Sequence, residues 1–175
     1  MGDGVSVRLA EVEAYAGVDD PASHAWRGPT PRTEVMFGPP GRLYIYFSYG
    51  MHWCANVVCG PDGTASAVLL RAGAVVDGLP LARSRRVGAS DRDLARGPAR
   101  LTRALGLARP DDGADLSSRT PPRLQLGDPL PAELVSAGPR VGIARAADVT
   151  WRFWITDDPA VSPYRRHTAR HRSAT

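Results

Sequence analysis

Residues 43–76 read LYIYFSYGMHWCANVVCGPDGTASAVLLRAGAVV, and this stretch decides the fold. Its apolar runs are rich in aromatic and β-branched residues and are bounded by turn formers, which is the pattern of strands. The sequence GPDGT at residues 60–64 favours a hairpin turn. We therefore predict strands over Arg42–Tyr49, Trp53–Cys59 and Ala65–Val76, which together form a mostly antiparallel sheet.

A further strand is predicted near the start of the chain, over Val5–Tyr15. Alternate residues of a strand share one face, and here one face carries apolar residues followed by two carboxylates and a tyrosine. These residues are Val5, Val7, Leu9, Glu11, Glu13 and Tyr15. We interpret this change from apolar to polar residues along one face as a strand that leaves the core and enters a functional site.

Loops and short helices are predicted between and after these strands. Gly17–Gly41 is rich in residues that favour turns. Long irregular segments in a compact domain more often have a function than not. We expect one short helical turn within it, over Thr33–Phe37. Leu79–Leu107 is predicted to be helical with a break near Gly97-Pro98, because proline suits the first turn of a second helix.

The last third of the chain is predicted to be less regular. Ala108–Pro131 is rich in Pro, Asp and Ser and is expected to be an irregular segment at the surface, with one short strand over Arg123–Leu126. Val141–Ala144 and Trp151–Ile155 are predicted as closing strands. Residues 163–175 are basic and are expected to form a flexible tail.

Length and composition indicate one globular domain. A chain of 175 residues suits a single domain, which we place over residues 1–162 as an α+β fold with a mostly antiparallel, curved sheet flanked by short helices. No apolar run reaches the length of a membrane span and no secretion signal is recognised, so we expect a cytoplasmic location. Cys54 and Cys59 are too few for a disulfide scaffold and are expected to be buried thiols.

The chain has a net positive charge, which is carried by arginine without any lysine. The net charge of +4 is a modest hint of a polyanionic partner. All 22 basic residues are arginine, so the chain contains no lysine. A Schiff base with a substrate would therefore need the α-amino group.

The aromatic residues are concentrated in the same stretch that predicts the sheet. Six of the twelve aromatic residues lie in residues 37–53. Tyr44 and Tyr46 share one face of their strand, which is suited to stacking on a base. The other face consists of core residues, Leu43, Ile45 and Phe47. The alternative is an aromatic strand that simply packs under loops.

Several segments of the chain resemble one known family. In sequence order they are EVEAY (11–15), SHAWRGPTPRTEVMFGPPGRLYIYFSYGMHWCANVV (23–58), VLLRA (68–72), GPARLTRALGL (97–107) and PRVGI (139–143). Together they resemble the small, single-domain alkyladenine (3-methyladenine) DNA glycosylases, from about Arg8 to Ser162. The resemblance implies an α+β fold on an antiparallel sheet and removal of alkylated or deaminated purines from double-stranded DNA, without a metal or cofactor.

The resemblance also implies which residues carry the chemistry. Breaking the bond between sugar and base leaves positive charge on the sugar, and a carboxylate both deprotonates water and stabilises that charge. Glu13 matches the catalytic glutamate of the family, whereas Glu11, on the same face, is expected to be structural. Arg71 matches an arginine beside the catalytic water, with a strand-end salt bridge as the alternative.

Further matches concern the damaged base itself, which must be flipped out of the duplex to be reached. Tyr15, His24 and Tyr46 match residues that stack on the flipped purine, and aromatic rings attract cationic alkylated purines. His24 alone would more often be a solvated loop histidine. Asn56 matches a position that excludes guanine, or else it satisfies backbone groups near a bend.

Contacts with the rest of the DNA are implied at the hairpin and at several arginines. Tyr49 matches the residue that fills the gap left by the flipped base, and Met51 matches a neighbouring wedge residue; the alternative for Tyr49 is a turn aromatic that caps the core. The candidates for phosphate contacts are Arg27, Arg32, Arg42, Arg100 and Arg140. Each of these arginines could equally be a solvated surface residue.

The family also has features that this sequence does not match. Members usually carry a helix and a strand before the position where Val5 begins, so we expect either that this element is missing or that the natural start lies upstream. We expect a monomer that hydrolyses the bond without cutting the strand. Two other interpretations remain: a DNA-binding paralogue without catalysis, which leaves Glu13 without a role, and a hydrolase of free nucleosides.

Overall fold

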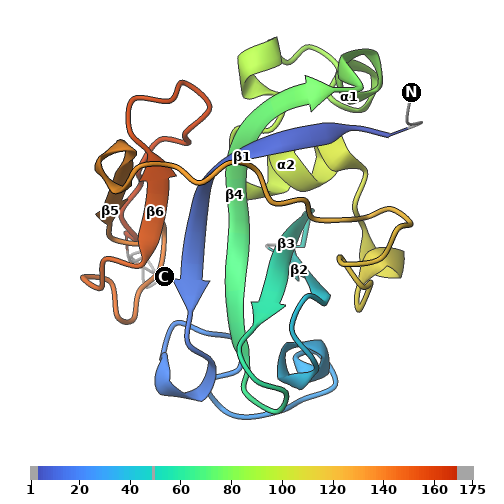
Figure 1. Ribbon diagram of the computed structural model, residues 1–175. Coiled ribbons are helices and arrows are strands. Elements are labelled where there is room, and N and C mark those ends of the chain that lie inside the picture. The colour runs from blue at the N-terminus through green and yellow to red at the C-terminus, as the bar shows by residue number, and fades with distance from the viewer. Residues whose placement is uncertain (1–3, 49, 169–175) are drawn as a thin grey trace, which may run out of the picture.

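Six strands form one antiparallel, open sheet in the order β2-β3-β4-β1-β6-β5 (Figure 1). The computed structural model describes residues 4–48 and 50–168. The strands are β1 Ser6–Tyr15, β2 Leu43–Ser48, β3 His52–Cys59, β4 Ser66–Asp77, β5 Val135–Gly138 and β6 Arg152–Ile155. The predicted α+β class and mostly antiparallel sheet are therefore confirmed.

The strands predicted from alternation and turn formers are confirmed, but two short predicted strands were wrong. Residues 123–126 have no regular structure, and Leu126 is exposed there. Residues 141–144 are also irregular, because Gly142 has a positive φ of 70° and because the N–H of Val141 binds a side chain instead of a neighbouring strand. The edge strand lies earlier, at β5, and pairs with β6.

The predicted helical region contains two short α-helices, but the break between them, over residues 86–97, is longer than predicted. Only α1, Leu79–Arg85, and α2, Pro98–Leu105, are α-helical, and proline begins α2 as predicted. Between them the chain turns at Gly88, which has a φ of 80°, and inserts the side chain of Leu94 into the core from a loop. Short 3₁₀ turns occupy Gly17–Asp19, Glu34–Phe37, Asp91–Asp93, Arg109–Asp111 and Ala132–Leu134. No helix in the described residues has the length and apolar character that a membrane span needs.

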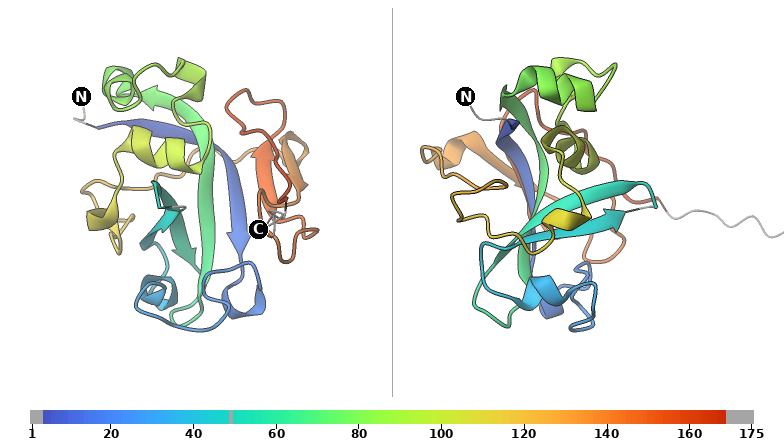
Figure 2. Two further views of the ribbon diagram at one scale, coloured as in Figure 1. Left: turned by 180° about the vertical axis from the view of Figure 1, so that it is seen from behind. Right: turned by 90° about the vertical axis from the view of Figure 1, so that its right-hand side faces the viewer.

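Both α-helices lie on the same face of the sheet (Figure 2), and the main core lies between them and the strands. Leu43 and Ile45 of β2 are fully buried in this core, as predicted. Phe47 was also predicted to be a core residue, but it is 46% exposed. The strand has run past the helices at this point, so Phe47 packs against Trp53 on the neighbouring strand, with 4.7 Å between ring centroids.

A second, smaller core lies under the loop that precedes β2. Tyr44 is 1% exposed within it and packs with Ala25, Met36, Val58 and others. For Tyr44 the plainer interpretation, an aromatic residue packed under loops, is the right one.

The strand β1 changes face near its middle, where Figure 1 shows both β1 and β4 bending. The β1–β4 ladder is irregular on either side of Glu11. Leu9 before the irregularity and Val12 after it pack against the same main core, although they lie an odd number of positions apart. The apolar residues and the carboxylates therefore do not share a face, and the prediction of one continuous face was wrong.

Candidate active site

Glu11 is the centre of a buried ion-pair network. Its Oε1 accepts hydrogen bonds from Arg71 Nε and Arg152 Nε, both at 2.7 Å. Its Oε2 accepts a hydrogen bond of 2.7 Å from the backbone N–H of Ser162. Burial raises the pKa of Glu11, but the charge of Arg71 and these hydrogen bonds outweigh that effect and lower the pKa below its ordinary value. Both oxygens of Glu11 are thus occupied by structural partners.

Glu13 is also fully buried and is held by two hydrogen-bond donors. The N–H of Val141 donates to its Oε1 at 2.6 Å, and the hydroxyl of Tyr15 donates to its Oε2 at 2.9 Å. Burial and the neighbouring Glu13 raise the pKa of the Tyr15 phenol, so Tyr15 remains a proton donor. The carboxylate of Glu13 therefore has a fixed orientation.

Arg71 connects the two glutamates. Its Nη1 lies 3.3 Å from Oε1 of Glu13, while its Nε binds Glu11. Burial lowers the pKa of Arg71, but the charges of Glu13 and Glu11 raise it by more, so the guanidinium keeps its charge. The salt bridge left open as an alternative for Arg71 is present, and it places the positive charge next to Glu13.

Arg140 forms a second buried ion pair, with Asp20. Both side chains are inaccessible, and the guanidinium donates to both oxygens of Asp20. This placement does not fit the phosphate contact predicted for Arg140, because DNA cannot reach a guanidinium enclosed in this way. Asp20 was not singled out in the sequence, since its partner lies 120 positions away.

These residues make up the full set of buried charges in the described part of the chain. Three carboxylates face three guanidiniums, namely Glu11, Glu13 and Asp20 with Arg71, Arg140 and Arg152. The opposite charges balance, as buried charges require.

Aromatic side chains gather near the same end of β1. The ring of His24 contacts Tyr46 edge-on, with 4.4 Å between centroids, and its Nδ1 lies 3.2 Å from the Tyr44 hydroxyl. Burial, first, and the charge of Arg32 lower the pKa of His24, although part of the ring remains exposed. Tyr15 is close enough to Tyr46 to contribute to its raised pKa, after burial and Cys54. His24 and Tyr46 are therefore in contact, and the register that pairs Glu13, Leu69, Asn56 and Tyr44 in turn across the sheet brings the end of β1 toward them.

Asn56 of β3 lies opposite Tyr44 of β2 and is 4% exposed. Its Nδ2 donates to the backbone carbonyl of Tyr44 at 3.2 Å. The structural role that the sequence left open is therefore present. Exclusion of guanine by Asn56 stays a prediction.

The hairpin between β2 and β3 carries the predicted wedge. Tyr49 lies outside the described residues, so its role stays a prediction. Met51 lies at the end of the turn, directly before β3, and is 69% exposed, which leaves it free to contact a partner.

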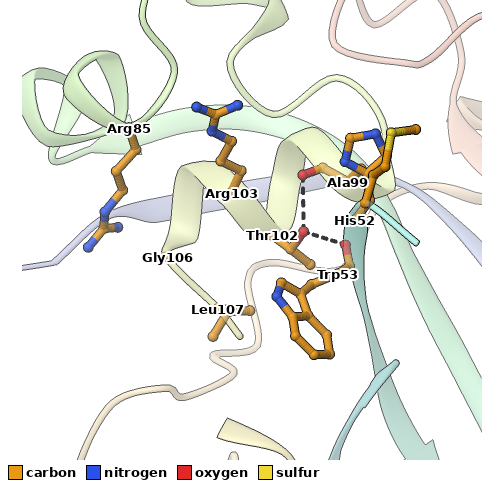
Figure 3. A pocket seen from close by; sticks show the side chains of 9 residues that line it. His52, Trp53, Arg85, Ala99, Thr102, Arg103, Gly106 and Leu107 are labelled. Carbon is orange, nitrogen blue, oxygen red and sulfur yellow. Dashed lines mark hydrogen bonds between the residues drawn. The ribbon is translucent and has the colours of Figure 1, made fainter. Parts of the chain in front are cut away.

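A groove separates the start of β3 from α2 (Figure 3). The Oγ1 of Thr102 donates to the Trp53 carbonyl at 2.6 Å and so fixes the helix against the strand. The lining residues are Met51, His52, Trp53, Arg85, Ala99, Thr102, Arg103, Gly106 and Leu107. Arg103 is exposed and makes no ion pair within the described residues. Arg103 was not among the arginines predicted to contact phosphate, although its position one turn after Arg100 on α2 was a signal for it.

The remaining predicted phosphate contacts are at the surface. Arg32 lies over the ring of Tyr46, at 5.8 Å from its centroid. Arg42 lies 3.9 Å from Asp115 and Arg100 lies 3.5 Å from Asp93, and both arginines remain partly exposed. Arg27 is exposed beside its neighbour Trp26.

Comparison with known proteins identifies the class to which this fold and site belong. The chain is a DNA glycosylase, a hydrolase of N-glycosidic bonds in base excision repair. More particularly, it belongs to the methylpurine-DNA glycosylase family, whose sequence model matches residues 1–159.

Relatives named 3-methyladenine DNA glycosylase support this assignment. A protein of Nocardia farcinica is 59% identical over 169 residues, covering 93% of this chain and 80% of the relative. A protein of Streptomyces avermitilis is 54% identical over 172 residues, with 96% and 81% covered. One from Mycobacterium tuberculosis is 54% identical over 173 residues, with 94% and 83% covered.

Proposed function

We propose that this glycosylase flips alkylated or deaminated purines out of duplex DNA and excises them with Glu13 as the catalytic base. The observation that carries the proposal is the environment of Glu13. Its carboxylate is oriented by Tyr15 and Val141, lies beside the charged Arg71, and stands near an aromatic cluster. A fixed carboxylate next to flat rings suits hydrolysis at a bound base.

The aromatic cluster suits the damaged base. His24 is exposed, Tyr15 and Tyr46 are only partly buried, and the rings of His24 and Tyr46 are in contact. Alkylated purines such as 3-methyladenine and 7-methylguanine carry positive charge, and aromatic faces attract cations. Normal purines are neutral and lack this attraction, so selectivity for the cationic lesions would begin at binding.

The chemistry follows from the carboxylate. As the bond between C1′ and the base breaks, its electron pair leaves with the base and positive charge develops on the sugar. Glu13 takes a proton from a water molecule while the water oxygen bonds to C1′. Arg71 limits the cost of holding Glu13 as an anion in a buried place.

The proposal is tested by a single-turnover excision panel. Duplexes would carry 3-methyladenine, 7-methylguanine, hypoxanthine or ethenoadenine at one position, with an undamaged duplex and the free nucleosides as controls. Release of at least one damaged base from duplex DNA is the expected result. Release from free nucleosides alone would instead identify a nucleoside hydrolase.

The groove of Figure 3 suits the DNA backbone beside the wedge. We predict that Arg100→Ala and Arg103→Ala each lower the salt dependence of duplex binding, because a lost phosphate contact reduces the slope of log K against log salt by about 0.9. Fluorescence anisotropy between low and moderate salt measures the slope. Arg83→Ala is the matched control, since Arg83 lies on α1 and is paired with Asp91; an equal effect of all three variants would assign the slope to net charge alone.

We also predict that the protein does not cut the DNA strand. A glycosylase that does so usually forms a Schiff base with the sugar through an amine, and this chain has no lysine. Borohydride added during turnover should trap no covalent protein–DNA adduct on a denaturing gel. A trapped adduct would overturn the prediction and point to the α-amino group.

A further inference from the structure

The buried pair of Asp20 and Arg140 is connected to both hydrogen-bond donors of Glu13, Tyr15 and Val141. Arg140 Nη1 donates to the carbonyl of Ala14, the residue after Glu13, at 2.9 Å. The guanidinium also lies over the ring of Tyr15, 4.6 Å from its centroid. Tyr15 is one of the two donors to the Glu13 carboxylate.

The second donor to Glu13 is tied to the same pair. Val141, whose N–H binds Glu13 Oε1 at 2.6 Å, directly follows Arg140 in the chain. A shift of Arg140 would therefore move the backbone N–H of Val141 and the ring of Tyr15 together. Both oxygens of the carboxylate would lose their alignment.

Asp20 extends the connection to the loop that carries His24. Its Oδ1 accepts a hydrogen bond of 3.0 Å from the N–H of Ala22, and its carbonyl accepts one of 2.8 Å from the N–H of Ser23. One ion pair thus joins β1, the loop leading to His24 and the segment at Val141.

The pair is poorly explained by stability alone. A buried ion pair often contributes no more than apolar residues of similar volume would. In addition, Arg140 Nε is buried with no hydrogen-bond partner among the described residues, which carries its own cost. A planar guanidinium does, however, offer what a positioning group needs: a two-pronged bond to Asp20 and a flat face for Tyr15.

We infer that Asp20 and Arg140 are positioning residues for the excision reaction, which align Glu13 through Tyr15 and Val141. The inference rests on the proposed function of Glu13. Misplacing a catalytic group by about 1 Å can cost roughly 10²-fold in rate. The loss should appear in the chemical step, because neither Asp20 nor Arg140 is exposed to DNA.

The test compares Asp20→Asn with a matched control, Asp158→Asn. Asp158 also pairs with an arginine, Arg8 of β1, and also accepts a hydrogen bond from the N–H two residues later. Single-turnover excision at saturating duplex should fall about 10–100-fold in Asp20→Asn, with the half-saturating concentration within about twofold of wild type. Asp158→Asn should keep the wild-type rate. Equal rates in the two variants, or a loss in binding alone, would overturn the inference.

A double-mutant cycle separates positioning from general damage to the fold. If Asp20 acts through Glu13, adding Asp20→Asn to Glu13→Gln should not lower the residual excision rate further. An equal further loss would show that Asp20 acts elsewhere. Should Asp20→Asn fail to fold, Arg140→Lys replaces it, because lysine keeps the charge but not the planar fork. A wild-type protein that excises no base would refute the proposed function itself, whichever variant is compared.

Discussion

Glu13→Gln is expected to lower the single-turnover excision rate by about 10²–10⁴-fold, the usual contribution of a general base. Glutamine has the same shape, so its carbonyl can still accept from the Val141 N–H, and its NH₂ can donate to the Tyr15 oxygen. The substitution removes the proton acceptor but keeps the two hydrogen bonds that orient the side chain. Chemical-quench time courses on a lesion duplex measure the rate, and anisotropy measures the affinity, which should stay close to the wild-type value.

Glu133→Gln provides the control for this variant, because Glu133 is an exposed glutamate in a distant 3₁₀ turn. It should excise at the wild-type rate. If Glu13→Gln also excises normally, another group activates the water and the assignment of Glu13 is wrong. A wild-type protein that binds lesions but excises none would match the non-catalytic paralogue.

Glu11→Gln is expected to lower the free energy of unfolding by about 3–5 kcal/mol, because it leaves Arg71 and Arg152 buried without their common anion. For a domain of this size, that corresponds to a fall in Tm of roughly 6–20 °C. Urea unfolding followed by circular dichroism measures the free energy. The matched control is Asp91→Asn, which breaks the exposed pair with Arg83 and should leave Tm unchanged.

The pH dependence of the same variant provides a second check. The pKa of Glu11 is lowered by folding from its ordinary value of 4.5, so the unfolded state takes up the proton first as the pH falls. The stabilisation by Glu11 is complete above pH 4.5 and is lost as the pH falls through the lower, folded-state pKa. The difference in unfolding free energy between wild type and Glu11→Gln should therefore shrink below pH 4.5. A constant difference would contradict the ion-pair account.

Local sequence signals predicted the main strands well. Alternation and turn residues are properties of a few neighbouring residues, and they located β1 to β4 and β6. These signals failed where a contact with a residue distant in the sequence determines the backbone conformation. Val141 looked like part of a strand, yet its N–H is used by Glu13, and Phe47 looked like core because alternation does not say where the helices end.

The candidate site was only partly predictable. Glu13, Tyr15, His24 and Tyr46 were found by resemblance to a family, and the structure places Tyr15 against Glu13 and His24 against Tyr46. Arg140 was expected at the DNA surface, since nothing near it in sequence reveals its partner Asp20. Arg152 and Ser162 were missed as partners of Glu11 for the same reason.

The buried charges also limit how early during synthesis the fold can be completed. Glu11 emerges early from the ribosome, whereas Arg152 and Ser162, which neutralise and bind it, are synthesised 141 and 151 positions later. Until then the carboxylates of β1 remain hydrated, and β1 cannot pair with β6. Contacts of such long sequence separation form late because closing the intervening loop is entropically costly. Excision is therefore expected to require synthesis through at least Ser162, and a product that ends before Arg152 should excise no base.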